Sequence, residues 1–160
     1  MLPITIPFIS NELGRVGFDA LVSAADNKSL KKIRFKLDYG SDFTTLSCEA
    51  LRLLGYSQEF LKNCPLHDKK ASLAADEVNV PLQYITNVSI KFGYRELQNC
   101  RVFFALDTGL RSLFGTDLLK YFNANVDYDD GVLKLYERRI KPGLANGEDK
   151  PIQIYSIENG

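Results

Sequence analysis

The sequence lacks an excess of charge of either sign, because its 160 residues carry 20 basic and 20 acidic side chains. A neutral chain has no overall field to attract nucleic acid or an anionic membrane, so we expect neither partner. No apolar run approaches the roughly 20 residues of a membrane helix. The apolar residues 1–14 lack a basic leader segment and contain Pro3 and Pro7, unlike a secretion signal. We therefore expect a soluble, cytoplasmic protein.

Cysteine is also scarce. Cys48, Cys64 and Cys100 are three in number and do not have the spacing of a metal site, and His67 is the one histidine that could complete a mixed site. An odd number of cysteines fits small apolar core residues in a reducing compartment better than a disulfide framework. We predict no metal and no cofactor.

Internal repeats and low-complexity segments are missing as well, which argues against a repeat protein. A chain of 160 residues is long enough to bury about 70% of its unfolded surface in one core. We predict one domain over residues 1–137, followed by a tail over residues 138–160. The alternating segment near the end of that tail, residues 152–157, predicts a strand that pairs with this sheet or with a second copy of the chain.

Alternation of apolar and polar residues dominates the rest of the chain and predicts a mainly β fold. The segments with this period of two are residues 17–23, 33–37, 78–85, 88–93 and 100–106. Residues 123–136 predict a further hairpin, in which Asp130 and Gly131 suit a tight type I′ turn.

Two short helices are predicted among these strands. One follows Ser47, a suitable N-cap, and ends near Gly55. The other covers residues 116–122, with Thr116 or a neighbour as its cap. Residues 57–77 are polar, and we expect them to form a surface excursion before the chain returns as a hairpin.

Two motifs in this order resemble the retropepsin-like aspartic proteases. The first is FKLDYGSDFTTLS, residues 35–47, which is similar to the family's loop of apolar residue, Asp, Thr or Ser, Gly, and Ala or Ser. The second is SLFGTDLLKYFNANVDYDDGVLKLY, residues 112–136, which is similar to the family's apolar pair, Gly-x-Asp and following hairpin. The resemblance spans residues 16–136 and implies the acid protease fold, a retropepsin-like closed β-barrel with one or two short helices.

The resemblance implies that the protein is an aspartic endopeptidase that hydrolyses peptide bonds as a homodimer. Each protomer would supply Asp38. The two carboxylates would share one proton, because carboxylates about 3 Å apart cannot both ionise. One carboxylate would activate a water molecule while the protonated one polarises the scissile carbonyl group. The implied partners are a second copy of the chain and a peptide or protein substrate.

The residues around the implied catalytic carboxylate have supporting roles in the same resemblance. Gly40 would let the loop approach its symmetry mate, and Ser41 would hydrogen-bond the outer oxygen of the carboxylate. Leu113, Phe114 and Gly115 would pack beneath the loop and hold it rigid.

The chain departs from the family at two points. Tyr39 stands where the family has a small hydroxyl residue that reaches across the dimer axis. The segment in the place of the substrate-covering flap, residues 71–84, lacks a glycine at its expected tip, where Ala74, Ala75 and Asp76 would turn instead. An alternative interpretation is therefore a catalytically weak or inactive module of the same fold that dimerises or binds peptides, and a third is a small β-barrel that shares the turn chemistry.

Three other aspartates are predicted to have structural roles and not catalytic ones. The tripeptide at residues 107–109 is an intact Asp-Thr-Gly, but only five residues separate it from Gly115, too few for the helix, the flap and the strands between the family's two motifs. We predict that this tripeptide forms a turn. Asp42 is predicted to accept hydrogen bonds from loop amides. Asp117 suits the first turn of a helix, where the helix dipole favours a carboxylate.

Overall fold

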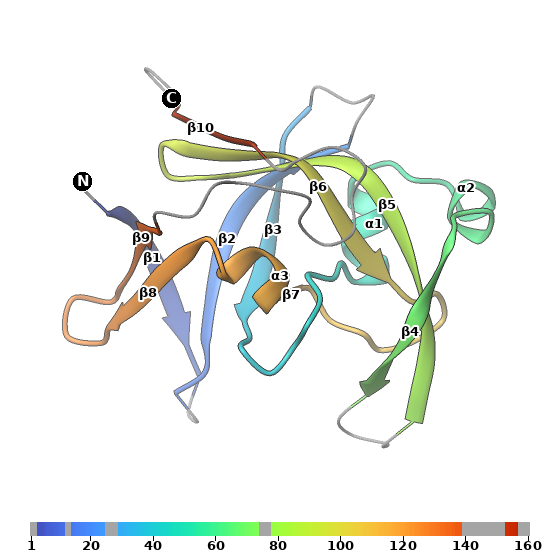
Figure 1. The fold of residues 1–160 in the computed structure, drawn as a ribbon, viewed down its shortest axis with the longest axis horizontal. Coiled ribbons are helices and arrows are strands. Elements are labelled where there is room, and N and C mark those ends of the chain that lie inside the picture. The colour runs from blue at the N-terminus through green and yellow to red at the C-terminus, as the bar shows by residue number, and fades with distance from the viewer. Residues whose placement is uncertain (1–2, 12–13, 25–28, 74–77, 139–152, 157–160) are drawn as a thin grey trace.

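A computed structural model describes residues 3–11, 14–24, 29–73, 78–138 and 153–156 of the chain. Most of these residues lie in strands, with three short helices between them (Figure 1). The elements, in chain order, are β1 (Ile4–Ser10), β2 (Val16–Ser23), β3 (Lys31–Leu37), α1 (Cys48–Leu53), α2 (Gln58–Lys62), β4 (Leu66–Leu73), β5 (Val78–Phe92), β6 (Arg95–Phe104), β7 (Leu113–Phe114), α3 (Thr116–Leu119), β8 (Phe122–Asp127), β9 (Val132–Glu137) and β10 (Gln153–Ser156). The prediction of a mainly β fold with short helices is confirmed.

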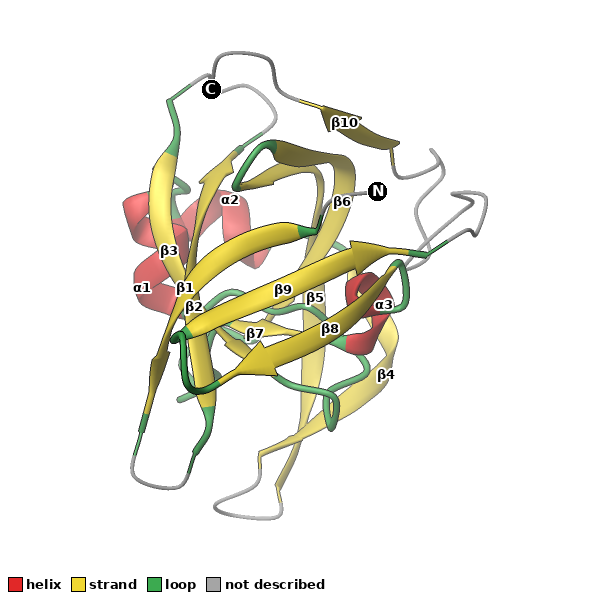
Figure 2. Cartoon of the chain, turned by 90° about the vertical axis from the view of Figure 1, so that its left-hand side faces the viewer, coloured by secondary structure: helices red, strands yellow, loops and turns green. Residues whose placement is uncertain are grey.

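The described strands form one strongly curved sheet in the order β10-β6-β5-β2-β1-β9-β8. Off this path, β4 pairs with β5, and β3 pairs with β2 on one side and with β7 on the other. Recorded neighbours run antiparallel except β3 and β7, which are parallel. The strand β1 changes partner along its length, because residues 8–10 pair with β2 and residues 4–7 with β9. This change joins the β8–β9 hairpin to the rest of the sheet (Figure 2).

The strand β2 shows why the alternating pattern specifies a sheet here. Its buried and half-buried residues alternate along all eight positions, with Phe18, Ala20 and Val22 on the buried side. Successive side chains of a strand point to opposite faces, so one face of β2 packs into the core while the other meets solvent. The same register places Phe18 opposite Phe35 of β3.

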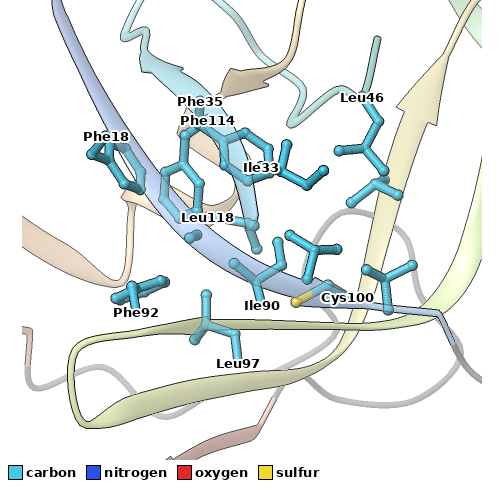
Figure 3. Packing of buried hydrophobic residues seen from close by; sticks show 14 of the residues in the cluster. Phe18, Ile33, Phe35, Leu46, Ile90, Phe92, Leu97, Cys100, Phe114 and Leu118 are labelled. Carbon is cyan, nitrogen blue, oxygen red and sulfur yellow. The ribbon is translucent and has the colours of Figure 1, made fainter. Parts of the chain in front are cut away.

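The centre of the core is a cluster of phenylalanines around Phe114 of β7 (Figure 3). The ring centroid of Phe114 lies 5.4 Å from that of Phe18 and 5.9 Å from those of Phe35 and Phe92, all in edge-to-face contacts. Such contacts add about 0.5–1.5 kcal/mol each beyond the burial of the rings. The strand β7 has only two residues, so the packing of the Phe114 ring in the core contributes most to holding it in place.

The β8–β9 hairpin exists as predicted, but its turn differs from the prediction. Asp127 pairs with Val132, which leaves a loop of four residues between the strands. Gly131 has a φ of +66°, whereas Asp130 does not have a positive φ, so the type I′ prediction was wrong. The amide of Asp130 instead donates to Oδ1 of Asp127 at 3.0 Å, which closes the wider loop.

The two alternating segments between residues 78 and 93 are not separate strands. They form the single 15-residue strand β5, whose register against β6 shifts between Ile85 and Val88 and again before Ile90. Asn87 has a φ of +58° at this place. Asparagine tolerates this left-handed conformation better than most residues do, so the strand bulges there and does not end.

The helix predictions were correct in position but not always in length. Ser47 caps α1, since its hydroxyl accepts the amide of Ala50 at 3.2 Å. The helix α3 is shorter than predicted and ends before Phe122, which already belongs to β8. The N-cap of α3 is Gly115, the neighbour of Thr116, and no side chain caps this helix by hydrogen bonding.

The predicted surface excursion over residues 57–77 contains α2 and β4, and β4 pairs with β5 as the hairpin that was expected to follow. Ser57 caps α2 with a hydrogen bond from the amide of Phe60 at 3.1 Å, and Leu61 is the buried residue of this helix. The first strand, β1, was missed, although Ile4 and Ile6 alternate with exposed neighbours.

The final predicted strand is present as β10, and it pairs with β6 of its own chain. Residues 139–152, which precede it, lie outside the described residues, so the domain boundary at residue 137 stays a prediction. Among the described residues, no helix is both long enough and apolar enough to cross a membrane.

Candidate active site

The candidate site begins where β3 ends, at Asp38. Its amide donates to the carbonyl oxygen of Phe114 at 3.1 Å, which continues the parallel pairing of β3 with β7 for one further residue. Its Oδ1 accepts the amide of Gly40 at 2.9 Å. The side chain is 23% exposed. The structure therefore presents one oriented, solvent-accessible carboxylate on a loop fixed to the core.

Gly40 lies within the hydrogen-bonded ring that this carboxylate closes. A Cβ atom at residue 40 would lie 3.1 Å from Oδ1 of Asp38, closer than most Cβ contacts. The hydroxyl of Ser41 donates to the carbonyl oxygen of Phe43 at 2.7 Å. The prediction that Ser41 hydrogen-bonds Asp38 was therefore wrong for the single chain, because the hydroxyl has one proton and the Phe43 carbonyl receives it.

Leu113, Phe114 and Gly115 lie directly against this loop. The amide of Thr116 donates to the carbonyl oxygen of Ser41 at 2.9 Å. A Cβ atom at Gly115 would overlap the backbone of Phe43, 2.4 Å from its carbonyl oxygen. The second motif therefore needs a glycine here because two backbone segments meet too closely for any side chain.

The strongest link between the two motifs was missed by the sequence reasoning. Thr44, which is fully buried, donates its hydroxyl to Oδ1 of Asp117 at 2.6 Å and its amide to Oδ2 at 3.1 Å. The same hydroxyl accepts the amide of Gly115 at 3.1 Å. Asp117 does lie in the first turn of α3, as predicted. Its carboxylate also takes the role predicted for Asp42, which is exposed and has no recorded side-chain hydrogen bond among the described residues.

Lys36 is a second neighbour of the carboxylate that the sequence reasoning missed. Its Nζ lies 3.7 Å from Oδ2 of Asp38, and its side chain is 32% exposed. The two residues are two positions apart along the end of β3, so both side chains point to the same face. The alternation of side chains along the strand was enough to predict that Lys36 and Asp38 lie on the same face.

Tyr39 lies at the outer surface of the loop, where it is 59% exposed. It lines a hollow of about 410 Å³ together with residues from α3 and the start of β8. In the single chain its side chain therefore points away from the core. Within the described part of the chain, no three His, Cys, Asp or Glu side chains gather closely enough to hold a metal ion.

Comparisons with known proteins bear on this arrangement. No protein-family model matches the chain, and no curated protein does. Among solved structures, it is similar to one titled as the crystal structure of a retropepsin-like aspartic protease from Rickettsia conorii. The two share 27% sequence identity with a TM-score of 0.57, over 84% of this chain and 91% of that one. This chain has a retropepsin-like fold.

The retropepsin-like fold distinguishes the two Asp-x-Gly segments of the chain. Asp107 follows β6 with a φ of +57°, and the hydroxyl of Thr108 donates to the carbonyl oxygen of Ala105 at 2.8 Å. These features form a self-contained turn, as predicted. Asp38, by contrast, follows β3 directly, and its amide donates to Phe114 of β7. The two retropepsin-like motifs contribute these two strands.

The β4–β5 hairpin contains the described part of the segment predicted as the flap, and it extends away from the rest of the sheet at the lower right of Figure 1. The two strands pair as far as Leu73 and Val78. The predicted tip residues, Ala74, Ala75 and Asp76, lie outside the described residues.

Proposed function

We propose that this chain is an aspartic endopeptidase that acts as a homodimer, with Asp38 of each protomer forming the catalytic pair. The observation that carries the proposal is the loop geometry, in which the Asp38 carboxylate is oriented by the Gly40 amide and fixed to the core through Phe114. The similarity to a structure titled as a retropepsin-like aspartic protease supports the same chemistry. One chain supplies one such carboxylate, so the reaction requires a second copy.

The reaction would need no group beyond the two carboxylates and a water molecule. The ionised carboxylate accepts a proton from water, whose oxygen attacks the carbonyl carbon of the peptide bond, while the protonated carboxylate donates a hydrogen bond to the carbonyl oxygen. The oxyanion of the tetrahedral intermediate then re-forms the carbonyl group as the C–N bond breaks, and the leaving nitrogen takes the proton that the first carboxylate accepted from water. The products are a carboxylic acid and an amine, and the pair returns to its singly protonated state.

The substrate would be an extended peptide between the Asp38 loop and the β4–β5 hairpin. A strand bound in this way forms main-chain hydrogen bonds with its neighbours, and its alternate side chains enter pockets that determine specificity.

The proposed setting is the cytoplasm, because Cys48, Cys64 and Cys100 are all free thiols, which a reducing compartment maintains.

The test compares the chain with its Asp38→Asn variant in a peptide-library digest over acidic to neutral pH. We expect the variant to lose cleavage while it keeps the fold and the dimer, because the amide is nearly isosteric with the carboxylate but cannot act as a base. Asp107→Asn is the matched control and should retain full cleavage. Cleavage by Asp38→Asn, or a sedimentation result showing a monomer under conditions of full activity, would contradict the proposal.

The second candidate is a module of the same fold that dimerises or binds peptides without cleaving them. The exposed side chain of Tyr39 favours it, because tyrosine is bulkier than the small hydroxyl residue that retropepsin-like proteases have at this place. Tyr39→Thr separates the two candidates. A protease limited by Tyr39 should cleave faster after this substitution, whereas a binding module should remain inactive.

A further inference from the structure

A groove of about 660 Å³ lies against the part of β3 that precedes Asp38. Its walls come from the β1–β2 turn, the outer face of β3, the start of α1 and the segment 108–112 that leads into β7. Lys36 belongs to this lining and also approaches Asp38 to 3.7 Å. Lys36 is therefore the residue that links the groove to the candidate site.

The charges of the groove differ from those of the whole chain. The lining contains one carboxylate, Glu49, and five cations, although the chain as a whole has equal numbers of basic and acidic residues. The five cations are Arg15, Arg34, Lys36, Arg52 and Arg111. Five positive charges and one negative charge leave an excess of four, so this groove concentrates positive charge on a neutral protein.

Two of these cations already have carboxylate partners. Arg34 pairs with Asp19 at 3.0 Å and Lys36 with Asp38 at 3.7 Å. For the other three, the structure records no ion pair with any described residue, and all three are exposed. They are Arg15, Arg52 and Arg111. The groove thus keeps unneutralised positive charge that solvent and a ligand can reach.

The place of the groove relative to the catalytic residue limits what can occupy it. Lys36 precedes Asp38 by two residues in a strand, a distance of about 7 Å. An extended peptide advances by about 3.3 Å per residue, so a substrate held at Asp38 would reach the groove two or more residues from the bond to be cut. Arginine side chains bind carboxylates through two parallel hydrogen bonds, which favours aspartate and glutamate side chains as ligands.

We propose that this groove binds an acidic segment of the substrate, with Asp or Glu side chains a few residues to one side of the scissile bond. This inference rests on the proposed peptidase function and adds the substrate class to it. The inference is carried by the complementarity between a carboxylate-bearing peptide and the three arginines for which no ion pair with a described residue is recorded. The groove shares Lys36 with the surroundings of the Asp38 carboxylate, so a substrate held at Asp38 is the occupant that can reach these charges.

The experiment compares pairs of peptides that differ only by Glu or Gln at two positions a few residues from the cleaved bond, placed first on one side of the bond and then on the other. We expect the chain to cleave the Glu peptide with a kcat/KM about tenfold higher, since one exposed ion pair contributes roughly threefold and two are expected to form. The preference should shrink as salt is raised, because ions screen exposed charges. In Arg111→Glu and Arg52→Glu it should disappear or reverse. Lys62→Glu, on α2, is the matched control that makes the same change of charge outside the groove and should keep the preference.

The possible outcomes separate this inference from the proposed function. Equal cleavage of both peptides overturns the inference and leaves the peptidase proposal intact. If neither peptide is cleaved, fluorescence anisotropy measures their binding to the Asp38→Asn variant. Tighter binding of the Glu peptide that Arg111→Glu removes then supports the groove while the peptidase proposal fails, and equal or absent binding overturns both. A single-stranded oligonucleotide of equal charge that competes as well as the Glu peptide overturns the assignment to an acidic peptide.

Discussion

The buried contact between Thr44 and Asp117 makes a quantitative prediction about what holds the Asp38 loop in place. Asp117→Ala removes two hydrogen bonds to a carboxylate, at 2.6 Å and 3.1 Å, and leaves two donors of Thr44 without this acceptor. A hydrogen bond to a charged group contributes about 1.5–3 kcal/mol, and Thr44 is fully buried. We therefore expect the free energy of unfolding to fall by about 3–5 kcal/mol.

Urea denaturation followed by far-ultraviolet circular dichroism measures this loss, with the slope of the transition as a check that the folded state is unchanged. Asp42→Ala is the control, because it removes a carboxylate from the same loop at an exposed position, where substitutions usually change stability by less than about 0.5 kcal/mol. If Asp117→Ala does not fold at all, Asp117→Asn keeps one acceptor oxygen and should lose roughly half as much.

The result that refutes this reasoning is a loss below about 1 kcal/mol for Asp117→Ala, or an equal loss for Asp42→Ala. A double-mutant cycle with Thr44→Val tests the pair itself. Both substitutions remove the same hydroxyl bond, so the double variant should lose less stability than the sum of the single variants. Strict additivity would show that the two residues act independently.

Two further predictions concern single residues. Gly115→Ala places a Cβ atom 2.4 Å from the Phe43 carbonyl oxygen, so thermal denaturation should show a loss of at least about 3 kcal/mol, and a melting temperature within a few degrees of the parent would contradict this. Burial raises the pKa of the Cys64 thiol, so at pH 8 iodoacetamide should alkylate it more slowly than it alkylates glutathione. The alkylation rate of Cys64, measured by mass spectrometry, should continue to rise at higher pH. Equal rates for Cys64 and glutathione at each pH would refute the raised pKa.

The elements that could be predicted from the sequence are those whose signals are local. The strands β2 and β3 follow from alternation, and the N-cap of α1 follows from Ser47 before a short apolar pattern. The helix α2 has only five residues and one buried side chain, Leu61, which is too little for a helical period to be visible. The strand β1 also alternates, but it contains Pro7, a residue type that is rare inside strands. The structure accommodates Pro7 at an exposed position opposite Val132.

The candidate site was predicted in its residues but not in its contacts. Asp38, Gly40 and the segment at residues 113–115 come from motifs and lie together in the structure. The Thr44–Asp117 contact joins residues 73 positions apart, and no local pattern indicates which of several aspartates will accept a given amide. Asp42 was the nearer choice, and it proved to be exposed.

The same distinction explains why the motif alone could not choose between the two candidate aspartates, Asp38 and Asp107. Asp-Thr-Gly at residues 107–109 is the better match to the family's tripeptide, yet Thr108 bonds to a carbonyl three residues away within its own turn. The loop at Asp38 instead bonds to residues from β7 and α3 more than 70 positions later in the chain. A catalytic carboxylate must be held within a fraction of an ångström, and rigid elements hold it better than an isolated turn does. The long-range support around Asp38, more than the letters of its motif, is therefore the feature that favours this residue for catalysis.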